Sequence, residues 1–285
     1  MTLPAASGAE VSLDRLVALA GLVRPATTAG LSHGLSGGLS GPKRGDGADL
    51  FDLRPYQDGD DLRRIDPAAT ARSGRPQVRS RHEDVERTLL LVADFRGPML
   101  WGTRGRFRSV AAAEALALAG WRAVLAGGRV GLVVLRDADL DVIAPQPREA
   151  AMLRIAGALA QHHAEALAAA ADGHDTLAPL LDAVSARAAP GVSICLATGL
   201  DDPGPDLGTA AAALMRKCPL EVLLVQDAVE TEAPRGRFAA RIGAGFRRGR
   251  FGPSPSADIL TRHDIPFRLL RADLPVEDQS EDRAA

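Results

Sequence analysis

The chain has 285 residues, of which 46% are hydrophobic and 25% are charged, so a wholly disordered chain is excluded. This length is enough for one large globular domain, or for a domain with an extension. The 34 Lys and Arg residues and the 36 Asp and Glu residues give a net charge of −2. A protein that neutralises nucleic-acid phosphates over its whole surface is therefore disfavoured, and any nucleic-acid site would have to be local.

The two cysteines, Cys195 and Cys218, do not form a Cys-x-x-Cys motif. They give no support for a disulfide scaffold, a zinc ribbon or a thioredoxin-type centre, and they suit a reducing compartment. Near the N-terminus the longest apolar stretch, Leu16 to Val23, is too short to span a bilayer, and Glu10 and Asp14 stand where a secretory signal has basic residues. We expect a cytoplasmic protein without a membrane-inserted segment.

The first predicted element is a short helix over residues 9 to 24, whose leucine and valine side chains fall on one stripe and which Pro25 ends. A glycine-rich stretch follows from Gly30 to Gly41, where the tripeptide Gly-Leu-Ser occurs three times. It lacks the Gly-Lys-Ser/Thr ending and the preceding strand of a phosphate-binding loop. We therefore interpret this stretch as a mobile loop.

From Arg87 onward, buried strands alternate with amphipathic helices, which predicts a doubly wound, mainly parallel α/β sheet. The predicted strands cover residues 88–93, 130–135, 140–143, 191–197, 220–226 and 267–270. The predicted helices cover residues 107–125, 147–171, 177–187, 207–217 and 256–263. The strand at 140–143 follows a short polar turn, so we expect it to be an antiparallel edge strand. The helix at 107–125 carries its charged residues in one sector, and we expect the rest of it to be buried.

The segment from Arg235 to Arg250 has six arginines and no acidic residue, and it predicts a basic, hairpin-like excursion before the last helix. Two interpretations stay open. Phe238, Phe246 and Phe251 interleave with the arginines, as on a surface that stacks nucleic-acid bases. Alternatively, the segment is a basic hairpin balanced by the acidic tail. This tail, residues 273–285, is predicted to be disordered.

The least generic stretch runs from Phe51 to Arg72 with the sequence FDLRPYQDGDDLRRIDPAATAR, and VRSRHEDVERTLLLVAD follows it. It resembles the signature of a bacterial and archaeal family called domain of unknown function 58. The positions that carry the resemblance are Phe51, Arg54, Tyr56, Gly59, Asp60, Asp61, Arg63, Ile65, Asp66, Ala71, Arg72, Val78 and Glu86. Pro67 departs from the pattern, because the family usually has tryptophan there. The resemblance continues more weakly to about Leu270.

The resemblance implies a von Willebrand factor A-like domain that works with a MoxR-type AAA+ ATPase in the assembly or maturation of protein complexes or in metal-cofactor insertion. It also implies a division into an N-terminal extension over residues 1–86, the A-like domain over residues 87–272 and the acidic tail. The extension lacks long apolar runs, so we expect it to pack on the sheet domain instead of folding alone.

The signature block itself is balanced in charge, because ten basic and ten acidic residues interleave between Lys43 and Arg87. Pairs of arginine and carboxylate can fix such a segment as a rigid surface structure, which is the simplest interpretation. The same framework could present a partner-binding surface, since aromatic and arginine anchors are common at interfaces. The residues that we assign to it are Arg54, Tyr56, Arg63 and Arg72. Catalysis by the aspartates of the block, Asp60, Asp61 and Asp66, has little support.

The resemblance also implies a divalent-cation site after the first sheet strand, built from an Asp-x-Ser-x-Ser turn with further Thr and Asp ligands. Asp94 stands at the first position, but Arg96 and Pro98 replace the two serines. Farther along the chain Thr198 remains, whereas Gly199 replaces the expected aspartate. Neither Arg96 nor Pro98 offers the oxygen ligands that magnesium requires, so we expect a degenerate site.

We expect Arg96 to pair with Asp94 or with Asp201 where the ion would lie. The alternative is weak, water-mediated magnesium binding by carboxylates that follow the predicted parallel strands. The candidates are Asp94, Asp201, Asp202 and Asp227.

No other group of residues supports an enzyme. His162 and His163 are adjacent on a predicted helix without a third ligand, and we interpret both as surface residues. Cys195 lies within an apolar strand, Ser185 and Ser193 have no Gly-x-Ser-x-Gly motif around them, and the segment after the first strand lacks the glycine spacing of a dinucleotide fingerprint. A non-enzymatic protein–protein interaction module is thus the leading hypothesis. A nucleic-acid-associated protein and a weakly metal-dependent A-like domain are the alternatives.

Overall fold

The computed structural model describes residues 8–23, 44–56, 65–82, 87–137, 139–169, 174–242, 245–250, 252 and 254–279. The chain divides into two compact units. One unit combines Met1–Ala29 with Arg87–Ala285 and contains the sheet domain, and the other is Gly30–Glu86. The predicted N-terminal extension is thus divided between the two units. The glycine-rich stretch from Gly30 to Gly41 lies outside the described residues.

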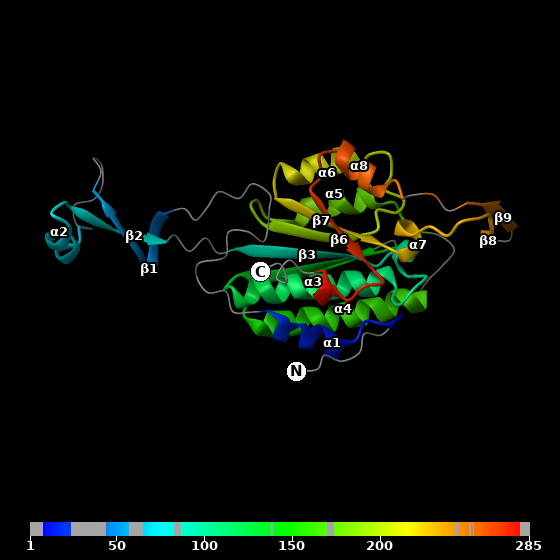
Figure 1. The fold of residues 1–285 in the computed structure, drawn as a ribbon, viewed down its shortest axis with the longest axis horizontal. Helices are drawn as coiled ribbons and strands as arrows, with labels where there is room; N and C mark the ends of the chain where they lie inside the picture. The colour runs from blue at the N-terminus through cyan, green and yellow to red at the C-terminus, as the bar shows by residue number, and fades with distance from the viewer. Residues whose placement is uncertain are drawn as a thin grey trace. The chain divides into compact units, whose positions relative to one another are not determined.

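A six-stranded sheet with the order β10-β7-β6-β3-β4-β5 forms the centre of the sheet domain (Figure 1). Its strands are β3 (Thr88–Asp94), β4 (Arg129–Arg136), β5 (Asp139–Pro147), β6 (Ser193–Thr198), β7 (Leu220–Gln226) and β10 (Phe267–Arg271). All neighbours are parallel except β4 and β5, which pair antiparallel at one edge. The prediction of a doubly wound, mainly parallel sheet with one antiparallel edge strand is confirmed.

Helices cover both faces of this sheet (Figure 1). The helices of one face are α1 (Leu13–Ala18), α3 (Arg108–Leu125) and α4 (Glu149–Ala169). Those of the other face are α5 (Leu177–Arg187), α6 (Leu207–Met215) and α8 (Ser256–Arg262). Side chains of β3 alternate between the two layers, since Leu91 and Ala93 join the first core and Leu90 and Val92 join the second. The apolar run of this strand is therefore explained by burial on both faces.

Helix α3 is buried more completely than its sequence predicts. The uncharged sector faces the core as expected, but Arg108 and Glu114 in the charged sector are also buried, with 1% and 2% of their surface exposed. On another side α3 lies close to α4, where a Cβ at Gly120 would come within 2.5 Å of the Met152 sulfur. Polar side chains from other elements must therefore neutralise the buried charges of α3.

The N-terminal helix packs on this layer. It begins after Ser12, whose side chain caps it, and it continues as a 3-10 turn, η1 (Leu19–Leu22). Leu16 and Leu19 are fully buried, and the Trp121 indole of α3 donates a hydrogen bond of 2.9 Å to the Leu16 carbonyl. The short helix predicted over residues 9 to 24 is thus a component of the sheet-domain core.

A buried ion-pair network joins both ends of the sheet domain to α3. Glu114 lies 3.4 Å from Arg15 of α1 and 2.5 Å from Arg106, and all three side chains are at least 93% buried. Arg15 also lies 2.6 Å from Glu277, in the 3-10 turn η4 (Val276–Asp278). We expected residues 273–285 to be disordered, which is wrong for this turn because Glu277 is an anchor of the network. Residues 280–285 lie outside the described residues.

The unit Gly30–Glu86 contains strand β1 (Arg44–Pro55), helix α2 (Pro67–Ser73) and strand β2 (Gln77–His82), with β1 and β2 antiparallel. Asp66 caps α2 by accepting a hydrogen bond of 2.8 Å from the Ala69 amide, and Pro67 follows at the first helical position. Gly74 ends the helix with φ +67°, a conformation that favours glycine. Ala69 and Val78 are buried. The dependence of this unit on the sheet domain stays a prediction.

The predicted basic hairpin is present. Its strands are β8 (Phe238–Ile242) and β9 (Gly245–Gly249), and it follows the short helix α7 (Ala228–Thr231) that succeeds β7. In the part of the chain that the structure describes, no helix is both long enough and apolar enough to cross a membrane.

We predict that replacing Glu114 by glutamine lowers the free energy of unfolding by about 3 kcal/mol, because two buried guanidinium groups lose their shared carboxylate. Urea denaturation measures this change. The control is Asp139→Asn, which removes an exposed carboxylate that lies 3.7 Å from the Arg136 guanidinium. This substitution should lower the free energy of unfolding by less than about 0.5 kcal/mol. Equal effects of the two substitutions would contradict the importance of the buried network.

Candidate functional site

The candidate site lies at the carboxyl edge of the sheet, where β3 and β6 are adjacent. The chain order of the strands reverses between these two, and open α/β sheets bind ligands at such a switch point. Three polar residues mark the edge: Asp94 ends β3, Thr198 ends β6 and Asp227 follows β7. All three are fully buried.

The Asp94 carboxylate is fully occupied by protein donors. Arg96 donates from Nε to Oδ1 at 2.9 Å and from a terminal nitrogen to Oδ2 at 2.8 Å. The hydroxyl of Thr198 donates to Oδ2 at 2.7 Å, and the Arg96 backbone amide donates to Oδ1 at 3.2 Å. The predicted pairing of Arg96 with Asp94 is therefore confirmed, in the bidentate geometry that suits guanidinium.

Arg96 is fully buried and links β3 to two later loops. Its remaining N–H groups donate to the carbonyl oxygens of Asp175 at 2.6 Å and Asp201 at 3.1 Å. Burial by itself lowers the pKa of this guanidinium, but the charge and hydrogen bonds of Asp94 outweigh burial, so that the pKa is raised above its ordinary value. A permanent positive charge therefore occupies the centre of the switch point.

A second arginine closes the edge beside Arg96. Arg108, at the start of α3, lies 2.8 Å from the Asp201 carboxylate and 3.0 Å from that of Glu230, and its guanidinium lies 4.6 Å from the Trp101 ring centroid. Burial raises the pKa of Glu230, and the neighbouring Arg108 charge opposes this increase. A Cβ at Gly199 would come within 2.5 Å of both Arg108 and Asp201. The absence of a side chain at Gly199 thus makes room for this ion pair.

The other candidate carboxylates have different partners. Asp227 caps α7 by accepting a hydrogen bond from the Val229 amide at 2.9 Å, and it accepts another from the Thr103 amide at 2.8 Å. Asp202 is exposed and lies 3.1 Å from the imidazole of His174. Neither carboxylate shares an ion-pair partner with Asp94.

These residues do not fit a magnesium ion. Both oxygens of Asp94 hold the Arg96 guanidinium, and the carbonyl oxygen of Pro98 accepts a hydrogen bond from Arg108. An octahedral shell of oxygen ligands would require displacement of a buried arginine. Among the described residues, no group of three or more His, Cys, Asp or Glu side chains could hold a metal ion.

The partner-binding residues that we assigned lie in the smaller unit. Arg72 is exposed in the last turn of α2, beside a shallow hollow of about 340 Å³ that Ala69, Ser73 and Gln77 also line. Tyr56 is half-buried, and its amide donates to the Pro76 carbonyl at 2.9 Å.

The backbone of Arg54 pairs with Val78 across β1 and β2, whereas Arg63 lies outside the described residues. Asp60 and Asp61 also lie outside them. Asp66 serves as the cap of α2, which accounts for its carboxylate without a catalytic role.

The matching family is described as "Protein of unknown function DUF58", and its model matches residues 52–238, more than half of the chain. The chain belongs to this family. Its similarity to solved structures is low. The DUF58 chain is similar to a conserved hypothetical protein, BatB, from Bacteroides thetaiotaomicron, with 14% identity and a TM-score of 0.45 over 70% of this chain and 97% of that chain.

It is also similar to an aerotolerance-related membrane protein from Bacteroides fragilis NCTC 9343 with multiple mutations to serines. The identity is 10% and the TM-score 0.44, over 69% of this chain and 97% of that chain. No curated protein matches the DUF58 chain.

A buried serine–histidine pair was missed by the sequence analysis. We interpreted His162 and His163 as surface residues, but His163 is 1% exposed and lies 2.8 Å from the hydroxyl of Ser109, joining α4 to α3. Its ring meets Phe95 edge-on at 5.3 Å, and burial lowers its pKa to about 4. The neutral ring therefore belongs to the core, because no substrate can reach it without disruption of the helix packing.

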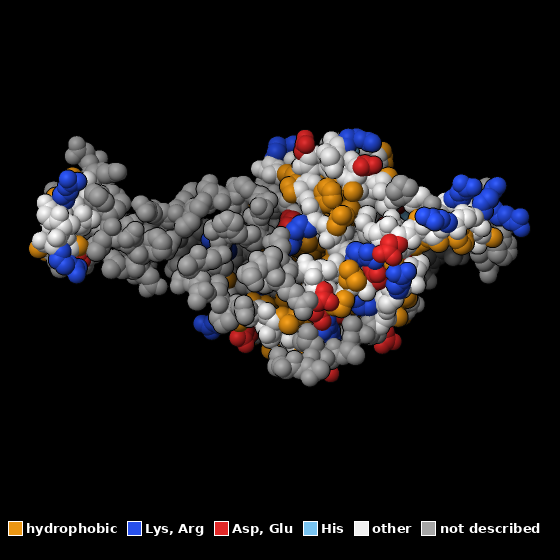
Figure 2. All heavy atoms as spheres, viewed as in Figure 1, with side chains coloured by type: hydrophobic (Ala, Val, Ile, Leu, Met, Phe, Trp, Pro, Cys, Tyr) orange, Lys and Arg blue, Asp and Glu red, His pale blue; other side chains and the backbone are white. Residues whose placement is uncertain are grey.

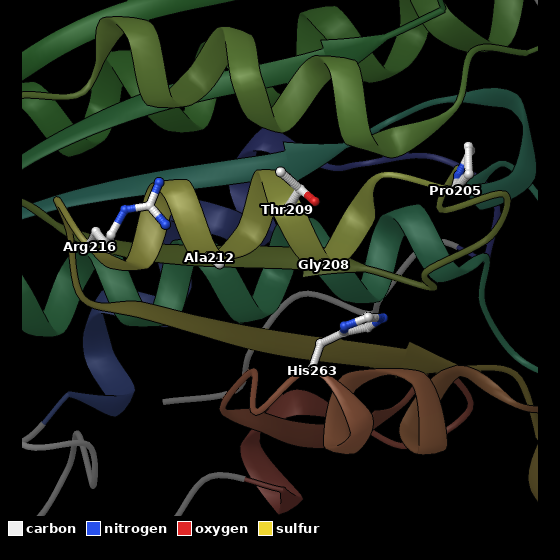
Figure 3. Close-up of a pocket in the computed structure, with 6 residues that line it drawn as sticks. All are labelled: Pro205, Gly208, Thr209, Ala212, Arg216 and His263. Atoms are coloured by element: carbon white, nitrogen blue, oxygen red, sulfur yellow. The ribbon is translucent and has the colours of Figure 1, made fainter.

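A shallow surface hollow of about 410 Å³ lies between α6 and the end of α8 (Figure 3). The residues that line it are Pro205, Gly208, Thr209, Ala212, Arg216 and His263. His263 points toward Gly208 in Figure 3, and a Cβ at that glycine would come within 2.4 Å of the ring. Gly208 is thus explained by packing of the histidine against α6.

We predict that the DUF58 chain binds magnesium or manganese no more tightly than millimolar, because the Arg96 guanidinium holds both oxygens of Asp94. Isothermal titration calorimetry measures this affinity. A micromolar dissociation constant that Asp94→Ala abolishes would contradict the prediction.

We also predict that His163 makes stability depend on pH. Its folded pKa of about 4 lies below its unfolded value near 6.5, so only the unfolded chain gains this proton as the pH falls between these values. The contribution of His163 to the free energy of unfolding therefore declines by up to about 1.4 kcal/mol per pH unit in that window. Urea denaturation from pH 7 to pH 4.5 should show a flatter profile for His163→Gln than for the wild type. The control is His263→Gln at an exposed ring, and an identical slope in all three proteins would disprove the assignment.

Proposed function

We propose that this chain is a non-enzymatic protein–protein interaction module that acts with a MoxR-type AAA+ ATPase in the assembly or maturation of protein complexes. The observation that carries the proposal is that buried arginines neutralise carboxylates at the switch point. The carboxylates at this edge that face Arg96 and Arg108 are neutralised by those arginines. This arrangement provides neither a nucleophile with its base nor a pair of free carboxylates for acid–base chemistry.

The sheet order supports a von Willebrand A-like assignment, because β3 and β6 lie in the middle and the antiparallel β5 forms one edge. In an A-like domain with an intact site, a partner carboxylate can complete the coordination shell of the cation. Arg96, which stands at the first serine position of the turn that the resemblance implies, is fully buried and holds both oxygens of Asp94. We therefore place recognition on side chains at other surfaces of the molecule.

The signature block is the first such surface. Arg72 is exposed beside a shallow hollow. Tyr56, which directly follows β1, is half-buried. Arginine and tyrosine are enriched among the residues that contribute most to binding at protein interfaces. Arg54 and Arg63 complete the proposed surface by their places in the family signature.

We predict that Arg72→Ala weakens binding of the full-length chain to the MoxR-type ATPase of the same organism about thirtyfold, because loss of an interfacial arginine anchor costs about 2 kcal/mol. Biolayer interferometry with the purified ATPase measures the affinity, and Arg54→Ala and Arg63→Ala are tested in parallel. The matched control is Arg75→Ala, since Arg75 is also exposed in the same unit.

Circular dichroism and thermal unfolding accompany each variant. Variants that unfold would show that the arginines support the structure of the block. Folded variants that bind the ATPase normally would exclude this surface as the interface. Absence of binding by the wild type would contradict the proposed partnership itself.

A further inference from the structure

The β8–β9 hairpin is a two-stranded sheet that pairs with no other described strand. In Figure 1 it projects from the sheet domain beyond α7, and Figure 2 shows arginine side chains gathered at it. An isolated two-stranded hairpin is marginally stable in water, and its outer edges present backbone N–H and C=O groups to a further strand. The backbone of this hairpin can therefore accept a further strand at an outer edge.

The charge of the hairpin comes from a short repeat. The sequence Arg-Gly-Arg-Phe occurs at residues 235–238 and again at residues 248–251. The two copies meet at the base of the hairpin: the first copy ends at Phe238, the first residue of β8, which pairs with Gly249 of the second copy, the last residue of β9. All four arginines of the repeats are exposed, and none forms an ion pair with another described residue; they are Arg235, Arg237, Arg248 and Arg250.

The rest of the molecule carries the opposite charge. The chain has a net charge of −2, and the six arginines between residues 235 and 250 contribute +6, so the remainder carries −8. A negatively charged body disfavours a long polyanion such as nucleic acid, which would have to run past the hairpin and along the domain. A short acidic segment can contact the hairpin alone, because salt screens repulsion beyond about 8 Å at physiological ionic strength.

We propose that the β8–β9 hairpin binds an extended acidic segment of a partner protein, which adds to it as a third strand. Backbone hydrogen bonds to the open edge provide affinity, as in other cases of strand addition. The exposed arginines of the repeats select carboxylates, with which their planar guanidinium groups form bidentate pairs. This inference rests on the proposed function as an interaction module, and it adds a second surface with a stated kind of partner.

The probe is a fluorescein-labelled peptide of twelve residues in which glutamate and valine alternate, and fluorescence anisotropy measures its binding to the full-length chain. We expect saturable binding that Arg248→Ala combined with Arg250→Ala weakens at least about tenfold. The matched control combines Arg154→Ala with Arg216→Ala, which removes the same charge from exposed positions on other elements and should change the affinity less than about twofold.

Three further probes separate the explanations. The same peptide with alternate backbone nitrogens methylated keeps its charge but cannot pair as a strand, and we expect it to bind at least about tenfold more weakly. Equal binding of the methylated peptide would overturn strand addition. Tighter binding of a twelve-nucleotide oligothymidine would assign the hairpin to nucleic acid, and tighter binding of vesicles with 30% phosphatidylserine would assign it to anionic lipid. Either result would overturn the proposal.

The outcome is independent of the ATPase experiment. Peptide binding without ATPase binding would retain the hairpin site and reject the proposed partnership. ATPase binding with no peptide binding by the wild type would reject the hairpin site and retain the partnership.

Discussion

The buried ion pair between Asp94 and Arg96 determines what the carboxyl edge of the sheet can do. A carboxylate that is fully removed from water at the end of a central strand requires a compensating positive charge, because an isolated buried charge is very unfavourable. Either a bound cation or a guanidinium group can supply that charge. The second solution is present in this chain, and the positive charge is covalently attached two residues from the carboxylate.

The arrangement around this pair follows from the size of a guanidinium group. Arg96 reaches carbonyl oxygens on two later loops, and so connects β3 with segments that a small ion would contact only through separate ligands. Arg108 occupies the neighbouring space, which the missing side chain of Gly199 leaves open. The carboxylates of this edge that face Arg96 and Arg108 are thus neutralised, and exposed arginines lie elsewhere, at the β8–β9 hairpin among other places.

Much of the fold could be predicted from the sequence, because apolar runs such as Leu89–Val92 have no satisfactory place except a strand buried on both faces. The pairing of Arg96 with Asp94 could also be predicted, since the two residues are close in the chain. Glu114 was different, because Arg15 lies in a distant helix and Arg106 in the irregular loop before α3, and no local pattern reveals how these segments are arranged around it. His163 was misassigned because a histidine next to another on a helix gives no indication of which ring faces inward. The need for a glycine at position 199 depends on Arg108, which is 91 residues earlier in the chain, so no local pattern predicts it.

The contact between Arg15 and Glu277 also has a consequence for how the chain is assembled. It joins a helix near the beginning of the sequence to a turn near its end, so the sheet domain is closed by side chains from both. The chain leaves this domain at Ala29 and returns at Arg87. The unit Gly30–Glu86, which contains most of the family signature, is therefore an insertion within a continuous domain and not an appendage at its end. A short flexible linker in place of the insertion would leave the pieces of the sheet domain in their native order, and the insertion could evolve its surface without altering the core that carries it.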